Sequence, residues 1–519
     1  MDPKKFRESA LSVIDYMLEY SKTIELRPVL PDVKPHYLMK LMPDEAPSEP
    51  HSIKTLLEQM ENNIMKGMTN WGHPQFHGYF PAGKGHPSVL ADIVSGMLGI
   101  QGFSWIASPA CTELEIVMLD WLGKAIGLPP EFLFYSDHSI GGGVIQGSAS
   151  ECVLVCMIAA RAQALKQLKE DGSEGDTYDY MRKLVCYTSE EAHSCVQKAA
   201  MICMVTIRIL ASDKRGALQG EVVLKAMDED VENGLVPFFI SACLGTTCST
   251  AFDNLDSIGA LCKEHPTVWL HVDAAYGGNA FICPEFRHLM KGIEYADSFN
   301  MNPNKWMNVA SDCSCMWVRD RNKLQESLAV DPVYLTHDHL VEAVDYRHWC
   351  IPLSRRMRSL KLWFTLSLWG VNGIQGYIRN HHKMAMYLES LIRKDPRFEV
   401  VSEVLCGLVC FRMKGDGDQL TQFLLSECNL SREIHLTPCV FKSRFIIRVS
   451  INYFDIKESD IDKSWGLILK HADQALKRRG GLHDMDDNMC FIHRTGRDVE
   501  INMFKLYDET IPIMLPPRE

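Results

Sequence analysis

A carboxylate at the end of an apolar stretch is the first residue with a candidate chemical role. Residues 268–276 read Val-Trp-Leu-His-Val-Asp-Ala-Ala-Tyr, which predicts a buried strand that delivers Asp273 at its carboxyl end. Open parallel sheets bind ligands at that end of their strands, and an unpaired buried carboxylate is costly. The protonated pyridine nitrogen of a bound cofactor would pair with Asp273, although an arginine or the start of the next helix would also satisfy it.

A lysine follows in the segment Asn302-Pro303-Asn304-Lys305-Trp306, among apolar and amide side chains. Desolvation lowers the pKa of a lysine and makes its amine nucleophilic. Taken alone, a lysine before a tryptophan is more typical of a surface residue whose stem packs on apolar side chains. Its occurrence downstream of Asp273 favours a covalent role for Lys305.

A glycine-rich segment upstream has the composition of a phosphate site. Residues 141–151 contain three consecutive glycines, then Gly147-Ser148-Ala149-Ser150-Glu151, and lead into a helical stretch over 152–169. Free backbone N–H groups and the positive end of the helix dipole would converge there on an anion. An ordinary loop with a serine cap is the alternative.

Two further polar groups follow predicted strands. His193 comes after an apolar stretch at 184–187, where its imidazole could stack on a cofactor ring or serve only the fold. Thr246 and Thr247 come after the strand predicted at 238–244, where they offer hydroxyls or form a turn. Along the chain, the glycine-rich cradle therefore comes first and is followed by His193, by Thr246 and Thr247, by Asp273 and by Lys305.

The bulk composition is typical of a globular protein and favours small-molecule chemistry. The 519 residues carry 54 Lys and Arg against 66 Asp and Glu, a net charge of −12, which disfavours a general nucleic-acid binder or an anionic-membrane binder. No stretch reaches the roughly 18 apolar residues of a membrane span. The 18 cysteines form no Cys-X-X-Cys pair, so we expect reduced, buried thiols, no metal site and a cytoplasmic protein.

The hydrophobic pattern divides the chain. An amphipathic helix is predicted over 5–24, and its apolar stripe could pack on its own subunit or on a partner. Strand-like and helical stretches alternate over 86–378, which predicts a parallel sheet wrapped by helices. A small α+β domain is expected over 379–479, with strands at 398–404, 407–412 and 445–451 and a helix near 461–477. Residues 480–519 form an accessory tail.

Taken together, these segments resemble the group II pyridoxal-phosphate decarboxylases of aromatic amino acids. The resemblance runs from about residue 1 to 475 and includes 103–105, 108–115, 146–151, 271–276 and 345–349. It implies the cofactor pyridoxal 5'-phosphate and an α/β fold of type I, similar to aspartate aminotransferase, with a mixed, mostly parallel sheet covered by helices on both faces. It also implies a homodimer with shared active sites, in which residues 1–85 pack on the partner subunit.

The resemblance also implies residue roles. Lys305 would bind the cofactor covalently, Asp273 would pair with its ring nitrogen, and His193 would stack on the ring. Tyr334, on a mobile loop over about 327–352, would protonate the intermediate; the alternative is a surface aromatic. Positions that match cofactor contacts are Ser148, Ala149, Ser150, Thr247, Asp273 and Asn302, and Arg448 matches an arginine of the C-terminal domain.

The substrate is expected to be an aromatic amino acid, with tyrosine favoured. The chain is most similar to invertebrate tyrosine decarboxylases through Ala82, Asn304 and Ser354, although Ser354 also occurs in histidine decarboxylases. Pocket positions are expected at Ala82, Gln101, Phe103 and Ser354. Gln101 and the pair Ala310-Ser311 depart from the common pattern, which predicts a roomier and more polar pocket and leaves DOPA or a bulkier aromatic open.

Two other functions remain on the same scaffold. Relatives that lack the loop tyrosine or the stacking histidine divert the intermediate to oxygen and release an aromatic acetaldehyde, ammonia and hydrogen peroxide. The presence of Tyr334 and His193 favours simple decarboxylation. A non-catalytic protein that retains the fold for binding is the third hypothesis.

Overall fold

The structure of the chain, a computed structural model, describes residues 1–172, 175–339, 342–415 and 417–482. Contacts group Met1–Ala472 into one compact unit and assign Asp473–Glu519 to a second. Most of the accessory tail predicted over 480–519 therefore lies outside the described residues. The domain boundaries predicted at 85 and 378 stay predictions.

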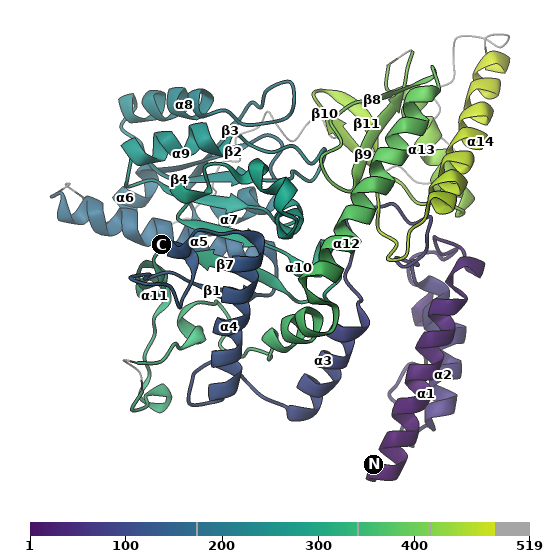
Figure 1. Cartoon of the computed structure of the whole chain (residues 1–519), viewed down its shortest axis with the longest axis horizontal. Coiled ribbons are helices and arrows are strands. Elements are labelled where there is room, and N and C mark those ends of the chain that lie inside the picture. The colour runs from purple at the N-terminus through teal and green to yellow at the C-terminus, as the bar shows by residue number, and fades with distance from the viewer. Residues whose placement is uncertain (173–174, 340–341, 416, 483–519) are drawn as a thin grey trace, which may run out of the picture. The chain divides into compact units, whose positions relative to one another are not determined.

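A seven-stranded mixed sheet occupies the centre of the first unit (Figure 1). Its strand order is β1-β7-β6-β5-β4-β2-β3, and only β7 runs against its neighbours among these described strands. The mostly parallel sheet expected from the sequence is thereby confirmed. The strands are β1 (Gly142–Gln146), β2 (Leu184–Ser189), β3 (Thr206–Leu210), β4 (Val236–Cys243), β5 (Trp269–Asp273), β6 (Ser298–Met301) and β7 (Ser314–Val318).

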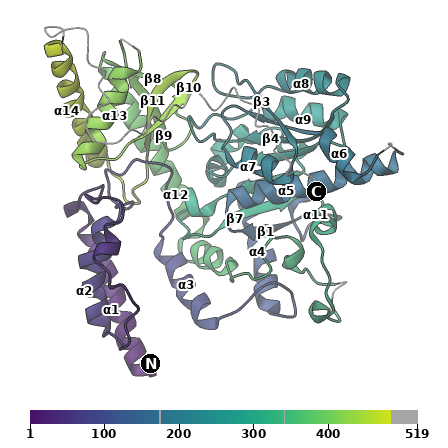
Figure 2. The same ribbon diagram turned by 180° about the vertical axis from the view of Figure 1, so that it is seen from behind.

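Apart from the exposed edge strand β3, both faces of this sheet are buried, because side chains that alternate along each strand enter two different cores. Val185 and Tyr187 of β2 join the core beneath α4, α8 and α9, whereas Leu184 and Cys186 join the core beneath α5, α7 and α11. Figures 1 and 2 show the two helical layers from opposite sides. These helices are α4 (Pro109–Ile126), α5 (Ala149–Glu170), α7 (Cys195–Cys203), α8 (Gly220–Glu232), α9 (Leu255–Glu264) and α11 (Arg321–Leu328).

A second, antiparallel sheet follows a long helix. Helix α12 (Ser359–Lys394) bends at Gly370, whose φ of 66° is favoured by glycine. The sheet order is β10-β11-β9-β8, and β10 and β11 form a hairpin across Lys442 and Ser443, both at positive φ. Its elements are β8 (Phe398–Val400), β9 (Leu408–Met413), α13 (Gln419–Ser431), β10 (Thr437–Phe441), β11 (Arg444–Ser450) and α14 (Glu458–Leu482).

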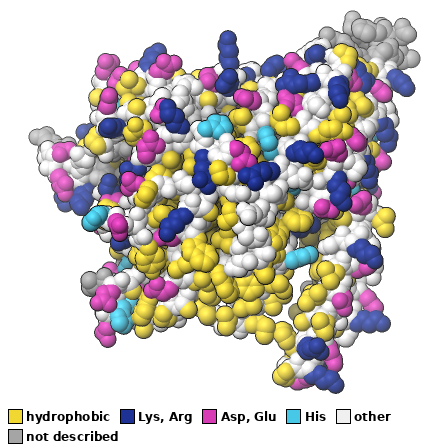
Figure 3. All heavy atoms as spheres, viewed as in Figure 1, with side chains coloured by type: hydrophobic (Ala, Val, Ile, Leu, Met, Phe, Trp, Pro, Cys, Tyr) yellow, Lys and Arg dark blue, Asp and Glu magenta, His cyan; other side chains and the backbone are white. Residues whose placement is uncertain are grey.

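The amphipathic helix predicted over 5–24 is confirmed as α1 (Pro3–Lys22), which is capped at its N-terminus by Asp2 and has no buried residue. Its apolar stripe is exposed on this chain, and so is much of α3 (His86–Leu98). Figure 3 shows apolar side chains gathered on the face that carries these helices. The remaining helices are α2 (Ile53–Gln59), α6 (Thr177–Lys183) and the short α10 (Pro303–Trp306).

One expectation about the cysteines is wrong. Fifteen described cysteines are buried and free, as predicted, but Cys248 and Cys439 form a disulfide. The sequence could not reveal this pair because the two residues lie on distant segments. Within the part of the chain that the structure describes, we find no helix with the length and apolarity that a membrane crossing needs.

Candidate active site

The predicted cofactor residues meet at one edge of the large sheet. Strands β1, β2, β4, β5 and β6 point the same way, so their carboxyl ends lie together. Each of these strands leads into one predicted group. The groups are Ser148 to Ser150 after β1, His193 after β2, Thr246 and Thr247 after β4, Asp273 at the end of β5, and Asn302 to Lys305 after β6.

Asp273 is 6% exposed, and the protein donates hydrogen bonds to one of its two carboxylate oxygens. Its Oδ1 accepts hydrogen bonds from the backbone N–H of Ala275 at 3.0 Å and from Nδ2 of Asn300 at 3.1 Å. Among the described residues, the hydrogen bonds to this carboxylate all go to Oδ1 and none goes to Oδ2. The carboxylate is thus held in one orientation with one oxygen available to a cationic partner.

Lys305 lies on α10, directly after the strand that borders Asp273. Its backbone N–H donates to the carbonyl of Asn302 at 2.9 Å, which holds the short helical turn. Desolvation lowers the pKa of the Lys305 amine, while the negative charge of Asp273 partly opposes the shift. A lysine of lowered pKa is a nucleophile suited to attack an aldehyde carbon.

An aromatic residue that the sequence analysis missed packs beside this lysine. Phe80 stacks on Tyr276 with ring centroids 3.8 Å apart, and Nζ of Lys305 lies 5.5 Å from the Phe80 centroid. The guanidinium of Arg448 lies 5.0 Å from the same ring. Two cations near one ring indicate that Phe80 helps form the site. Its place in Tyr79-Phe80-Pro81, just before Ala82, was the available signal.

The cradle after β1 is built as a helix N-terminus. Ser148 caps α5, its Oγ accepting from the N–H of Glu151 at 3.2 Å, while the Glu151 carboxylate accepts from the N–H of Gly147 at 2.8 Å. The N–H groups of Ala149 and Ser150 have no protein acceptor in the described ranges. Ser148 and Ser150 are exposed, so an anion can reach these donors.

The loop after β4 turns sharply to present its threonines. Gly245 has a φ of 93°, and a Cβ there would lie 2.8 Å from Cα of Gly277, so the turn needs glycine. Thr246 is buried and accepts from the N–H of Ala251 at 3.0 Å, whereas Thr247 is only half-buried. Thr246 therefore serves the loop, and Thr247 is the more accessible of the two hydroxyls.

His193 lies at the start of the segment that leads into α7. The residue is exposed, and its Nδ1 accepts from the N–H of Cys195 at 3.1 Å. Desolvation by the surrounding protein lowers the pKa of the imidazole, while the charges of Asp273 and Lys305 act on it in opposite directions. His193 is therefore within electrostatic reach of both groups.

The predicted pocket residues divide into two places. Ala82 lies near Lys305, because the N–H of Gly83 donates to the carbonyl of Asn304 at 2.8 Å. Gln101, Phe103 and Ser354 lie near the edge strand β1 instead. There, the N–H of Gly102 donates to the carbonyl of Arg355 at 2.9 Å, and Nη2 of Arg355 donates a hydrogen bond to the Ile145 carbonyl on β1. Gln101, Ser354 and Ala82 are exposed on this chain.

Tyr334 is 79% exposed and lies in a short 3₁₀ turn, Val333–Leu335, among the described residues 175–339. The chain is anchored on both sides of it. Asp331 pairs with Arg347 at 2.7 Å, and Nε2 of His337 lies 3.2 Å from the carboxylate of Asp345. Asp345 also accepts from the N–H of Trp105 at 2.9 Å. On this single chain the tyrosine is thus held at the surface, near the segment that carries Phe103.

Residues 35–414 match the model of the pyridoxal-dependent decarboxylase conserved domain, and the chain belongs to this family. It is similar to aromatic-L-amino-acid decarboxylase of Rattus norvegicus, with 47% identity over 92% of this chain and 99% of the relative. The corresponding Drosophila melanogaster protein is 46% identical, over 91% of this chain and 92% of the relative.

Solved structures show the same likeness. The crystal structure of Oryza sativa TDC with PLP and tryptamine gives a TM-score of 0.87 at 33% identity, covering 91% of this chain and 99% of that one. Rhodiola rosea 4-hydroxyphenylacetaldehyde synthase gives 0.85 at 35% identity, with the same coverage. The fold and the family together define this chain as a pyridoxal-phosphate-dependent carboxy-lyase.

The residues present fit pyridoxal phosphate. Oδ2 of Asp273 suits a protonated ring nitrogen, and the open helix N-terminus of α5 suits a phosphate. A buried polar atom without a partner in the described chain, Oδ1 of Asn302, lies directly after β6 at the same edge. Such atoms are costly when buried unpaired, which favours a polar ligand at this edge.

Proposed function

We propose that the chain decarboxylates an aromatic L-amino acid to its amine, with tyrosine converted to tyramine as the favoured reaction. The carrying observation is a lysine of lowered pKa at the same sheet edge as a buried carboxylate whose hydrogen bonds from the described residues all go to one oxygen. The relatives named for aromatic amino acids support the substrate class. Pyridoxal phosphate, when bound, supplies an electron-withdrawing ring that accepts the electron pair freed as carbon dioxide leaves.

We assign the protein's part in the reaction to residues at the sheet edge. Lys305 would hold the cofactor covalently until the substrate amine displaces it. Asp273 keeps the ring nitrogen protonated through Oδ2, and the N–H groups at the start of α5 hold the phosphate. His193 covers one face of the ring. Further cofactor contacts are assigned to Ser148, Ala149, Ser150, Thr247 and Asn302.

We assign proton donation to Tyr334. Its hydroxyl would deliver a proton to the substrate carbon after carbon dioxide leaves, and His193 would exclude oxygen from that carbon. The exposure of Tyr334 on a single chain and its anchored position near Phe103 support a site completed by a second copy. Gln101, Phe103 and Ser354 would then form the part of the substrate pocket opposite Ala82.

A homodimer accounts for the exposed apolar faces. Phe6, Ile14 and Leu18 on α1 and Ile93 and Met97 on α3 are at least two-fifths exposed on one chain. Apolar faces of this extent mark protein interfaces. Residues 1–85 would therefore pack on the partner subunit. The fifteen buried free cysteines favour a reducing compartment, which supports a cytoplasmic location.

One specific observation favours a second function, the aromatic acetaldehyde synthase reaction. The Rhodiola rosea 4-hydroxyphenylacetaldehyde synthase is structurally as similar as the decarboxylases. In that reaction the substrate carbon meets oxygen before it is protonated. Tyr334 and His193 are both retained here, which favours the amine product. Histidine decarboxylation, for which Ser354 is also suited, is the remaining substrate alternative.

A product assay on cofactor-loaded protein tests these proposals. Tyrosine, DOPA, tryptophan, phenylalanine and histidine are supplied separately, and mass spectrometry records amine and aldehyde while a coupled assay records peroxide. We expect amine without peroxide, with tyrosine turned over best, and no product from Lys305→Ala. Aldehyde with equimolar peroxide would instead establish the synthase reaction. Cofactor binding without any product would leave only a binding function.

A further inference from the structure

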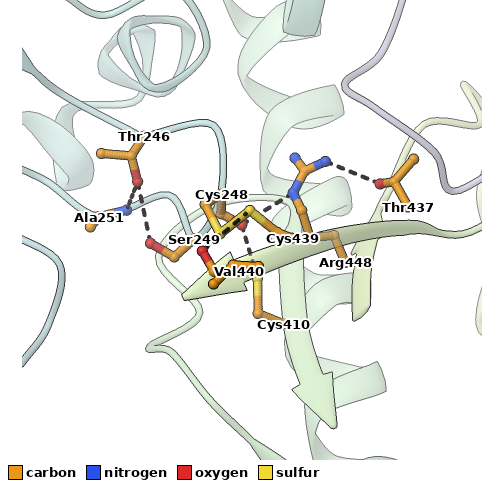
Figure 4. Close-up of a disulfide and its surroundings, with 9 residues drawn as sticks. All are labelled: Thr246, Cys248, Ser249, Ala251, Cys410, Thr437, Cys439, Val440 and Arg448. Carbon is orange, nitrogen blue, oxygen red and sulfur yellow. Dashed lines mark hydrogen bonds between the residues drawn. A yellow bond between two sulfur atoms is a disulfide. The ribbon is translucent and has the colours of Figure 1, made fainter. Parts of the chain in front are cut away.

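A covalent link joins the cofactor side of the large sheet to the small sheet. Cys248 lies in the loop after β4, and Cys439 lies on β10, 191 positions further along the chain. Their Cα atoms are 5.9 Å apart, within the usual range for a disulfide. Figure 4 shows the two sulfur atoms bonded between the loop and the strand.

Cys248 lies in a short loop that also carries Thr246 and Thr247. Two hydrogen bonds to Thr246 close this loop. The N–H of Thr250 donates to the Thr246 carbonyl at 2.9 Å, and the N–H of Ala251 donates to the Thr246 hydroxyl at 3.0 Å. The Cys248 carbonyl accepts from Nε of Arg448 at 3.1 Å and from the Cys410 thiol at 3.2 Å (Figure 4). A restraint on Cys248 is therefore a restraint on Thr246 and Thr247.

The same carbonyl connects the link to Lys305. Arg448 donates to Cys248 and to Oγ1 of Thr437, and its guanidinium lies against the Phe80 ring that also borders Lys305. Loosening Cys248 would remove one of the two hydrogen bonds that orient this buried guanidinium. Cys248 is thus linked to Lys305 through two intervening side chains, those of Arg448 and Phe80.

We propose that Cys248 and Cys439 form a reversible dithiol–disulfide site that, when oxidised, fixes the threonine loop to β10 and slows release of the cofactor. This inference rests on the proposed role of Thr247 as a cofactor contact. The other fifteen described cysteines are buried and unbonded, which distinguishes this pair. In a reducing compartment the pair would respond to the state of the thiol pool.

The exchange reaction balances with a small-molecule disulfide such as oxidised glutathione. The thiolate of Cys439, which is half-buried, attacks one sulfur of that disulfide and releases the first glutathione thiol. The thiolate of the more buried Cys248 then attacks the Cys439 sulfur, forms the protein disulfide and releases the second thiol. The protein pair loses two electrons and two protons, which the small disulfide takes up.

Peptide mapping of the full-length holoenzyme tests the bond without reference to catalysis. The protein is equilibrated with oxidised or reduced glutathione, alkylated and digested without reductant. We expect a linked pair of peptides containing Cys248 and Cys439 after oxidation, and two alkylated peptides after reduction. Alkylation of both cysteines under oxidising conditions, or pairing of either with another cysteine, would overturn the proposal.

The rate of cofactor release tests the consequence. Released pyridoxal phosphate is followed by its fluorescence while a carbonyl reagent traps it. Reduction should speed release about fivefold, which corresponds to about 1 kcal/mol. Cys439→Ser should release at the fast rate with or without reductant, whereas Cys262→Ala, a control on α9, should respond like the parent. Equal release rates from oxidised and reduced parent protein would refute the mechanism. Failure of the parent to bind cofactor at all would instead refute the proposed function.

Discussion

A buried ion pair connects the segment that carries Ser354 to the edge strand β1, which leads into the predicted phosphate cradle. Nη2 of Arg355 contacts Oε1 of Glu115 at 2.5 Å, and the two side chains are 1% and 0% exposed. The same Glu115 oxygen accepts from the N–H of Ile145 at 2.8 Å, and Arg355 donates to the Gly102 carbonyl at 3.2 Å. Burial disfavours the charged guanidinium, but the adjacent carboxylate outweighs it and raises the pKa of Arg355.

Replacing Glu115 by glutamine should destabilise the protein strongly. Glutamine keeps the shape and can still accept from Ile145, so the main loss is the charge that compensates Arg355. Breaking a buried ion pair by removing one partner costs about 3–5 kcal/mol. The matched control is Glu285→Gln, which breaks the bonds to Arg379 in a pair whose side chains are 48% and 46% exposed; it should cost at most about 1 kcal/mol.

Equilibrium urea unfolding of the cofactor-loaded protein measures both changes. The double variant Glu115→Gln with Arg355→Met removes both charges, so it should cost less than the sum of the two single variants by about 2 kcal/mol or more. If Glu115→Gln destabilises no more than Glu285→Gln, the argument that this pair is held together by mutual charge compensation is wrong.

Three other changes have expected outcomes. Tyr334→Phe should shift the product from amine towards aldehyde and peroxide, and an unchanged ratio would remove Tyr334 from the mechanism. Asp345→Asn weakens the anchors from His337, Arg347 and Trp105, so limited proteolysis should cut within 330–339 faster than in the parent; an unchanged rate would show that these anchors do not hold the segment. Burial lowers the pKa of His77 to about 4, whereas the unfolded chain takes up a proton below about pH 6.5. The buried, neutral His77 therefore contributes fully to the free energy of unfolding above pH 6.5. This contribution declines as the pH falls towards 4, and it is smaller by about 1.4 kcal/mol at pH 5.5. His77→Asn should reduce this acid loss in urea unfolding, and the same change at the exposed His86 should not.

The sequence alone predicted three of the five strands that lead into the candidate site, but not β1 or β6. Strands predicted at 184–187, 238–244 and 268–272 are confirmed as β2, β4 and β5, because continuous apolar stretches are what a parallel sheet buried on both faces requires. The helix predicted over 152–169 is confirmed as α5. Since parallel strands end at one edge, their order also predicted that the candidate site residues would meet there.

Other features could not be read from local patterns. Strand β10 contains Pro438 and exposes alternate side chains at the edge of the small sheet, so its stretch lacks the apolar signature of a strand. Phe80 carried no catalytic motif of its own, and its contacts with Tyr276 and Lys305 join segments far apart in the sequence.

Residue types and periodicity thus determined the class of fold and which side chains could do chemistry, because burial and backbone direction follow from short-range patterns. Only the tertiary structure decided that Cys248 meets Cys439, that Ala82 lies near Lys305, and that Tyr334 stands at the surface of one chain. These contacts join segments far apart in the sequence. Their formation depends on how the elements pack, and no local pattern records that packing.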